Sequence, residues 1–554
     1  MARKRILVAQ MTRMGDVLQT SPLIRALKQR EPESHITVMV RRMGKSIAEC
    51  NPDINDILVH EEDEVFRDLQ SDDPDRLLKV YGQTDAYIAQ LREGRYDIAY
   101  NCTHSLCSAM LLKLAGIPEV IGAHLSEDWR YVWRGRGPNY FITSVLHREA
   151  NDLNLCDSFR HFMQSPPVTN GLVLEVNAVA HAEAMSILAA NGIGDDGFVV
   201  CFQLGASDRD KRWPEAQFAA LAKVLVARNN ARIVLLGVSE EAALGVEFER
   251  HAPGVAAHLF GKTTIPQLAA ILKRARVLVT NDTGTMHIAA AVQCPIVLVS
   301  VGYVHFRETG PYGAGHYAVE LAREDVGRSD LRGRDAGAEH LITDSHVASA
   351  VEFVVSKDDV PVAMVPLEGV EVFRSEFAPD GCLQWYPVAR RNATHSDIVR
   401  MAYRPMWLED FRGKSTNEIE RDCLENLANH YAAPADSACW STLNDALSGL
   451  ANIGDRGETI TRELIDTLRR PGEMRQAKHL VSMLMALDEE LRVYAEIHSS
   501  CKPLVATARF DRENLEGSDP ALLAARTLDI YKSLCTRARS VAEKLDLLHD
   551  VLTR

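Results

Sequence analysis

Residues 5–27 read RILVAQMTRMGDVLQTSPLIRAL: an apolar run, a glycine turn and an apolar stretch with helical spacing. The run at 5–9 is short and almost continuously apolar, as in a strand buried on both faces of a sheet. Gly15 lets the backbone turn sharply after this strand, and a helix is expected over 21–29. The order strand, turn, helix predicts an α/β fold that binds ligands at the carboxyl edge of its sheet.

The same alternation continues to about residue 355, with helical patterns at 216–227 and 265–275. The predicted strands are residues 5–9, 36–40, 57–59, 97–101, 198–203, 232–236, 276–280 and 296–300. The stretch 157–174 contains two prolines and an Asn-Gly pair, which indicate a crossing between domains. We therefore expect two doubly wound α/β domains, at 1–170 and 171–357, with a ligand in the cleft between them.

The character of the sequence changes after residue 355. Residues 358–394 mix prolines and glycines with short apolar runs and predict an irregular linker, made of loop or of irregular β-structure. Residues 395–554 predict an all-α accessory domain without a fixed-period repeat. Its expected helices are residues 417–431, 458–468, 475–498 and 521–552.

Composition excludes several classes of protein. With 554 residues, 46% hydrophobic and 25% charged, the chain is neither disordered nor collagen-like. A formal net charge of −14 argues against nucleic-acid binding through a broad basic surface. No apolar run suits a membrane span or a secretory signal, so we expect a cytoplasmic protein. The 11 cysteines form no CxxC pair and are expected to be reduced thiols, with no metal site.

Two strings match nucleotide-binding motifs in the wrong context. Residues 192–197 satisfy GxGxxG, but they follow a helix and precede a strand, which predicts a helix end and a turn. Residues 261–264, GKTT, resemble the end of a phosphate loop. That loop requires a glycine five positions before Gly261, where this sequence has Ala256. Thr263 or Thr264 is expected to cap the next helix instead.

The first candidate site is the turn at 11–22, where Asp16 lies at or near a helix N-terminus. That position favours an ionised carboxylate. An ionised carboxylate facing a cleft can accept a proton from an attacking hydroxyl group. The alternative is that Asp16 only caps the helix, and its position in the sequence does not decide between the two roles.

The second candidate site is the turn at 203–214, QLGASDRDKRWP, which directly follows a strand. Lys211 as a point charge, with Arg209 or Arg212 as a planar fork, can hold a diphosphate there. The alternative is a solvated charged loop in which Trp213 is a packing anchor.

The third candidate site is the turn at 278–287, LVTNDTGTMH, with a helix beginning near Thr283. The amides of Thr283 and Gly284 form a natural anion site at that helix start. Asp282 can bind sugar hydroxyl groups from the same edge. For His287, a capping or core role is weighed equally with a catalytic one.

Together these turns resemble glycosyltransferase family 9, the heptosyltransferase family of lipopolysaccharide core synthesis. The matching segments are MGDVLQTSPLIRAL at 14–27, DKRWPE at 210–215, GKTTIPQLAAIL at 261–272, NDTGTMHIAAA at 281–291 and TGPYG at 309–313. The resemblance implies a GT-B architecture of two Rossmann-like domains, the first mainly for the acceptor and the second for the nucleotide sugar. It also implies inverting transfer without an obligatory metal or a cofactor. The helical region after 355 has no counterpart in an ordinary family member.

The resemblance also implies roles for individual residues. Asp16 matches the general base of the family, and Lys211 matches the lysine near the donor phosphates. The family's glutamate on the nucleotide ribose is expected at Glu241, with Glu240 left open. The residues that match the DTGxxH donor turn are Asp282, Thr283, Gly284 and His287.

The leading hypothesis is a glycosyltransferase that moves a heptose or a related sugar from a nucleoside diphosphate, with ADP-heptose as the expected donor, to a glycan, a lipid-linked saccharide or a protein. The competing hypothesis is a non-catalytic scaffold that binds a nucleotide sugar and recruits a partner through its helical region. That region is expected to hold the acceptor, to self-associate or to dock another protein, and peripheral contact with the inner membrane stays open. Residues 315–340 lack the cysteines often found there in the family, which leaves the acceptor undetermined.

Overall fold

The computed structural model of the chain describes residues 3–194, 196–322, 339–355, 367–413 and 417–554. Contacts between residues divide the chain into two compact units. Unit 1 consists of Met1–Thr103, Leu114–Glu119 and Leu153–Arg391. Unit 2 consists of His104–Lys113, Val120–Asp152 and Asn392–Arg554.

Unit 1 begins with four parallel strands in the order β3-β2-β1-β4. They are β1 (Arg5–Ala9), β2 (His35–Arg41), β3 (Asp56–His60) and β4 (Ile98–Asn101). Ile6 pairs with Ile36 on one side and with Ile98 on the other, so β1 is central and its apolar side chains are buried. The helices of this part are α1 (Met14–Gln19), α2 (Ser21–Arg30), α3 (Lys45–Ala48), α4 (Glu62–Leu69), α5 (Pro74–Glu93) and α8 (Leu155–Arg160).

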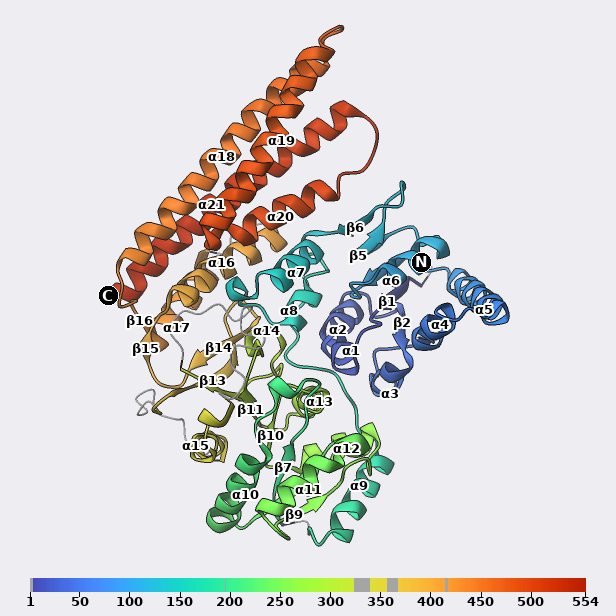
Figure 1. The fold of residues 1–554 in the computed structure, drawn as a ribbon, viewed down its shortest axis with the longest axis vertical. Helices are drawn as coiled ribbons and strands as arrows, with labels where there is room; N and C mark the ends of the chain where they lie inside the picture. Colours follow the sequence, from blue (N-terminus) through green and yellow to red (C-terminus); the bar gives the residue numbers. More distant parts are fainter. Residues whose placement is uncertain (1–2, 195, 323–338, 356–366, 414–416) are drawn as a thin grey trace. The chain divides into compact units, whose positions relative to one another are not determined.

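The second sheet of unit 1 has the strand order β14-β13-β12-β11-β10-β7-β8-β9 (Figure 1). The strands are β7 (Phe198–Gln203), β8 (Ala231–Leu236), β9 (Ala256–His258), β10 (Val277–Thr280), β11 (Ile296–Ser300), β12 (Tyr317–Leu321), β13 (Val370–Phe377) and β14 (Leu383–Pro387). β7 to β12 pair in parallel, and β13 and β14 are antiparallel. The helices are α9 (Ala178–Ala190), α10 (Glu215–Asn229), α11 (Ala242–His251), α12 (Ile265–Arg274), α13 (Gly284–Ala291), α14 (Phe306–Thr309) and α15 (Asp344–Val355).

The predicted α/β class with a helical C-terminal region is confirmed, and all the predicted strands are present. β1, β7 and β11 begin and end at the predicted residues. The cap expected before α12 is Thr264, whose hydroxyl accepts from the Gln267 N–H, while Gln267 Oε1 accepts from the Thr264 N–H. Gly192 has φ +73 just after α9, as the helix end predicted for the GxGxxG string requires.

The segment 358–394 was predicted to be an irregular linker. Between Val370 and Pro387 it instead forms the strands β13 and β14, which extend the second sheet. The prolines and glycines that suggested a linker include Pro379 and Gly381, which lie in the turn between these strands. Gly381 has φ +76 there. Pro361 and Pro366 lie outside the described residues. The breakers therefore mark a hairpin turn, which their density in the sequence did not distinguish from a linker.

The predicted crossing at 157–174 begins inside α8, with a buried ionic network. Asp157 and Arg160 form an ion pair at 2.8 Å, with side chains 0% and 2% exposed. Tyr312 donates its hydroxyl to Asp157 Oδ1 at 2.8 Å, and the Leu383 N–H donates to Asp157 Oδ2 at 2.9 Å. Tyr312 belongs to the TGPYG segment, so this motif fastens the crossing helix to the second sheet.

Unit 2 is mainly helical, and α18, α19 and α21 run side by side as long helices (Figure 1). Its helices are most of α6 (Leu106–Ala115), α7 (Arg136–Leu146), α16 (His395–Arg412), α17 (Asn417–His430), α18 (Ala438–Leu468), α19 (Met474–Ile497), α20 (Lys502–Glu513) and α21 (Pro520–Thr553). It also contains the antiparallel pair β5 (Val120–Leu125) and β6 (Tyr131–Arg134), and β16 (Tyr431–Ala432). β15 (Arg391–Asn392) lies at the boundary of the units. Within the described residues, no helix has both the length and the apolar character that a membrane span requires.

The division into units differs from the predicted boundaries, because residues 120–152 group with the C-terminal helices. The Trp133 N–H donates to Asn514 Oδ1 at 2.7 Å, and Asn514 Nδ2 donates back to the Trp133 carbonyl at 2.6 Å. The Tyr140 ring lies 5.2 Å from the rings of Trp407 and Phe411. These partners are hundreds of positions apart in the chain, so no local pattern could predict their contact.

Candidate functional site

Four turns of unit 1 meet at the carboxyl ends of parallel strands in the second sheet. β10 lies between β7 and β11, and β8 follows β7 on the outer side. The turn after β10 therefore has the turn after β7 on one side and the turn after β11 on the other. This is the edge at which open α/β sheets bind their ligands.

Lys211 and Asp282 form an ion pair between two of these turns. Lys211 ends the short helix η3 (Arg209–Lys211), and its Nζ donates to Asp282 Oδ2 at 3.0 Å. The two side chains are 13% and 14% exposed. The Lys211 Nζ also lies 4.7 Å from the centroid of the Tyr303 ring, which follows β11. The structure thus brings together the cation predicted in the second turn and the carboxylate predicted in the third.

The other candidates of the second turn have structural contacts. Trp213 is fully buried and donates its indole N–H to the Ile342 carbonyl at 2.7 Å, so it has the alternative role of packing anchor. Arg212 donates to the Ala206 carbonyl at 3.0 Å, within its own loop. Arg209 is exposed. Lys211 is therefore the cation of this turn that reaches Asp282, in the turn after β10.

Buried Asn281 connects the second and third turns. Its Oδ1 accepts from the Trp213 N–H at 3.0 Å, and its Nδ2 donates to the Leu204 carbonyl at 2.8 Å. The next residues, Thr283 and Gly284, begin α13, whose first N–H groups have no acceptor within the helix. The N–H groups of Thr283 and Gly284 thus directly follow Asp282, the carboxylate partner of Lys211, in the chain.

His287 lies in the first turns of α13 and is 6% exposed. Burial lowers its pKa, and the nearby carboxylates of Asp282 and Asp16 oppose this shift. Its Nδ1 has no hydrogen-bond partner within the described residues. A neutral imidazole follows.

Gly15 brings the turn of the first sheet against the start of α13, after β10. A β-carbon on Gly15 would lie 2.9 Å from His287 Cδ2 and 3.8 Å from Gly284 Cα. A side chain at residue 15 would therefore push the two turns apart. Asp16, the next residue, is partly buried, and its Oδ2 accepts from the Arg13 N–H at 3.1 Å. The capping contact weighed for Asp16 is thus present.

Glu241 and Glu240 have different environments. Glu241 ends the short helix η4 (Ser239–Glu241), and its Oε2 accepts from Gln203 Nε2 at 2.9 Å and from the Val238 N–H at 3.1 Å. A β-carbon on Gly205 would overlap Glu241 Oε1, which places this carboxylate against the turn after β7. Glu240 is exposed, and hydrogen bonds from its own backbone N–H and from the Ser239 hydroxyl lower its pKa. The geometry favours Glu241 over Glu240 as the inward-facing group.

Two contributors to this site, Gln203 and Tyr303, were missed by the sequence analysis. Gln203 accepts from the Thr285 hydroxyl at 3.0 Å through Oε1, and thus links α13 to Glu241. Tyr303 lies over Lys211. A polar residue at the last position of an apolar strand was a usable signal for Gln203. Nothing in the sequence around Tyr303 indicated its contact with a turn about 90 residues earlier.

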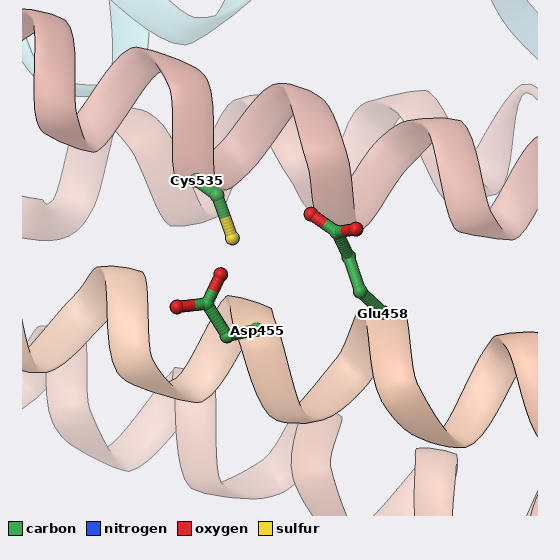
Figure 2. A group of neighbouring side chains, drawn as sticks. All are labelled: Asp455, Glu458 and Cys535. Carbon is green, nitrogen blue, oxygen red and sulfur yellow. The ribbon is translucent and has the colours of Figure 1, made fainter.

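A separate group of possible metal ligands lies in unit 2, formed by Asp455, Glu458 and Cys535 (Figure 2). Arg539 contacts both oxygens of Asp455, at 2.8 and 2.6 Å. Burial and the Asp455 carboxylate raise the pKa of Cys535 to about 12, so its thiol stays protonated. A protonated thiol and an arginine-paired carboxylate are poor metal ligands. The group is a helix contact between α18 and α21.

Comparisons with known proteins agree with this geometry. Residues 85–327 match the sequence model of glycosyltransferase family 9 (heptosyltransferase). Lipopolysaccharide heptosyltransferase 2 of Escherichia coli K12 is 26% identical over 306 residues, covering 53% of this chain and 81% of that protein. Lipopolysaccharide heptosyltransferase 3 of Escherichia coli is 25% identical over 351 residues, covering 57% and 91%. The crystal structure of a family 9 glycosyl transferase from Veillonella parvula DSM 2008 superimposes with a TM-score of 0.53 and 20% identity, covering 64% of this chain and 98% of that one.

Proposed function

We propose that this chain, whose residues 85–327 match the sequence model of glycosyltransferase family 9, moves a sugar from a nucleoside diphosphate to an acceptor hydroxyl group. The proposed donor is ADP-heptose, as the family resemblance implies. The proposed acceptor is a glycan, a lipid-linked saccharide or a protein. The names of the relatives favour a lipopolysaccharide core saccharide within that range. In a GT-B arrangement, the first sheet binds the acceptor and the second binds the donor.

Asp16 is the proposed general base. It takes the proton of the acceptor hydroxyl group as that oxygen attacks the anomeric carbon, and the bond from that carbon to the diphosphate breaks on the opposite face. The result is inversion at the anomeric carbon. The Arg13 N–H bound to Asp16 Oδ2 fixes the carboxylate and leaves Oδ1 to accept the proton.

Lys211 and the first amides of α13 are the proposed stabilisers of the leaving diphosphate. The leaving group gains negative charge in the transition state, and fixed cations and helix N-termini stabilise such charge. Lys211 can make this contact by exchanging Asp282 for a phosphate oxygen. Asp282 is then released toward the sugar hydroxyl groups, beside the neutral imidazole of His287.

Glu241 is the proposed ribose-binding residue. Its Oε2 has two donors from the protein, so Oε1 is the oxygen available to the ribose hydroxyl groups. A carboxylate held in this way selects a ribose with free hydroxyl groups, as in other dinucleotide and nucleotide sites of α/β sheets. Metal-independent transfer is part of this proposal, with Lys211 supplying the positive charge.

The observation that carries the proposal is the contact of Gly15 with His287 and Gly284, because it brings the Asp16 turn to the donor turn. The test is transfer from ADP-heptose by the wild-type chain, Asp16→Asn and the exposed control Asp85→Asn. We expect Asp16→Asn to bind ADP normally and to lose about 10²–10⁴-fold in kcat. Wild-type transfer by Asp16→Asn contradicts its role as base. Donor binding without turnover on any acceptor would instead support a non-catalytic scaffold.

A further inference from the structure

The turn after β11 contacts the lysine-bearing turn after β7 through Gly302 and Tyr303. We infer that Tyr303 is a positioning residue, which holds Lys211 so that its ammonium group meets the donor diphosphate. This inference rests on the proposed function and adds a residue to it.

Tyr303 contacts the lysine turn at both ends of its side chain. Its ring centroid lies 4.7 Å from Lys211 Nζ. Its hydroxyl donates to Asp208 Oδ2 at 2.6 Å. Asp208 Oδ1 accepts from the Asp210 N–H at 3.2 Å, in the short helix that ends at Lys211. One side chain therefore fixes both the start of η3 and the charged group at its end.

The backbone of the turn after β11 packs closely against η3 at Gly302. This residue has φ +62, and a β-carbon on it would lie 2.2 Å from the Asp210 carbonyl oxygen. Any side chain at residue 302 would separate the two turns. The close approach keeps Tyr303 at its distance from Lys211 without support from the ligand.

An aromatic ring suits this task better than a second carboxylate. The face of the ring attracts an ammonium group but accepts none of its N–H bonds in the manner of an oxygen. Lysine has three such donors, and Asp282 takes one of them in the structure. When a diphosphate replaces Asp282, the ring contact remains and all three donors are available to phosphate oxygens.

The order of the strands explains why these residues meet. β7 and β11 flank β10, so the turns that follow them converge over the end of β10, where Asp282 and the start of α13 lie. Lys211 comes from one flank and Tyr303 from the other. The diphosphate site is thus built from three turns, and the resemblance to the family supplied only two of them.

The experiment measures binding of ADP, GDP and UDP by calorimetry, and then follows the tightest of them and its nucleoside through the variants. We expect Tyr303→Leu to bind the diphosphate about 3- to 30-fold more weakly, and the nucleoside unchanged. Tyr303→Phe keeps the ring and loses the hydrogen bond to Asp208, so its loss in diphosphate affinity is expected to be smaller. The control is Tyr81→Leu, at an exposed position of α5. With an active donor, Tyr303→Leu should raise the donor KM and leave the acceptor KM unchanged.

Two outcomes overturn the inference while the proposed function stands. One is unchanged diphosphate binding by Tyr303→Leu. The other is an equal loss for nucleoside and diphosphate, which would mean that the whole site has been disturbed. A wild-type chain that binds none of the three diphosphates overturns the proposed function, and the inference with it.

Discussion

Lys211 in the α/β unit and Lys544 in the helical unit are both largely buried lysines paired with carboxylates. Lys211 pairs with Asp282, and Lys544 contacts Glu409 at 3.1 Å and Glu420 at 2.8 Å. Lys211 lies in a turn at a strand end, beside the N-terminus of α13, where the side chain of the N-cap residue Thr283 makes no capping hydrogen bond. Lys544 lies within α21, between carboxylates of α16 and α17. The surroundings of an ion pair, rather than its geometry, therefore indicate whether it serves a ligand or the fold.

The largest effect that would sharpen this comparison is expected for Lys211→Met. Loss of a fixed cation at the leaving group should lower kcat/KM by about 10²–10³-fold, the range for one transition-state donor. The thermal midpoint should change little, because Asp282 is close to solvent and keeps water as a partner. Steady-state transfer and thermal unfolding measure the two quantities. A large drop in the midpoint with unchanged kcat/KM would contradict the functional assignment.

Lys544→Met should show the opposite pattern. Glu420 is 4% exposed at its side chain, and burial already raises its pKa. Without the lysine its charge is uncompensated, and the free energy of unfolding should fall by about 3 kcal/mol. Chemical denaturation measures this change, with kcat/KM expected to stay within twofold at temperatures where the chain is folded. The double variant Lys544→Met, Glu420→Leu should recover part of the loss, and a failure to recover any would contradict the pairing.

The α/β unit was largely predictable because its signals are local. A strand buried on both faces is a short apolar run, and β1, β7 and β11 were predicted to the residue. The turns that bear Asp16, Lys211 and Asp282 directly follow such runs, so their place at the sheet edge follows from the strand order. What the sequence could not supply was contact between turns. Tyr303 is an example, because its partner is set by the order of β11, β10 and β7.

The sequence predicted the helices of the helical unit but not how they pack against one another. Amphipathic patterns predicted α19 and α21 to within one residue at each end. They did not predict Gly457, where a β-carbon would lie 2.3 Å from the Tyr531 ring, as a close crossing of α18 and α21. Nor did they predict that residues 120–152 pack against α16 and α20. These contacts depend on which helix faces meet, and many pairings bury similar apolar area.

Acid should destabilise both units, so the contrast between Lys211 and Lys544 does not extend to the pH dependence of stability. Burial lowers the pKa of His316, in unit 1, to about 4, and lowers those of His124 and His147, in unit 2, to about 4 as well. Below about pH 6.5 the unfolded chain binds a proton at each site and the folded chain does not. Stability is therefore lost as the pH falls from 6.5 to 4.

The variant His316→Gln isolates one of these sites. His316 is 3% exposed, so removal of its titration should flatten the pH dependence by about 3 kcal/mol over that interval. Denaturation at pH 7 and pH 4.5 compares the variant with the wild-type chain. Parallel pH profiles for the two chains would mean that His316 is protonated in the folded protein.

The smallest effect is expected for Gln203→Leu. This variant tests whether the hydrogen bonds of Gln203 couple α13 to Glu241. Gln203 receives a hydrogen bond from Thr285 on α13 and gives one to Glu241, so it connects the turn proposed to bind the diphosphate with the carboxylate proposed to bind the ribose. Leucine leaves Glu241 with the Val238 N–H alone. A net loss of about 1 kcal/mol in donor binding is expected, which is about a fivefold rise in the donor KM with little change in kcat.

Steady-state kinetics measures this rise in KM. The control is Gln83→Leu, at an exposed position of α5. A fall in kcat with unchanged KM would instead place Gln203 at the transition state, and the ribose carboxylate would then be oriented by its backbone contact.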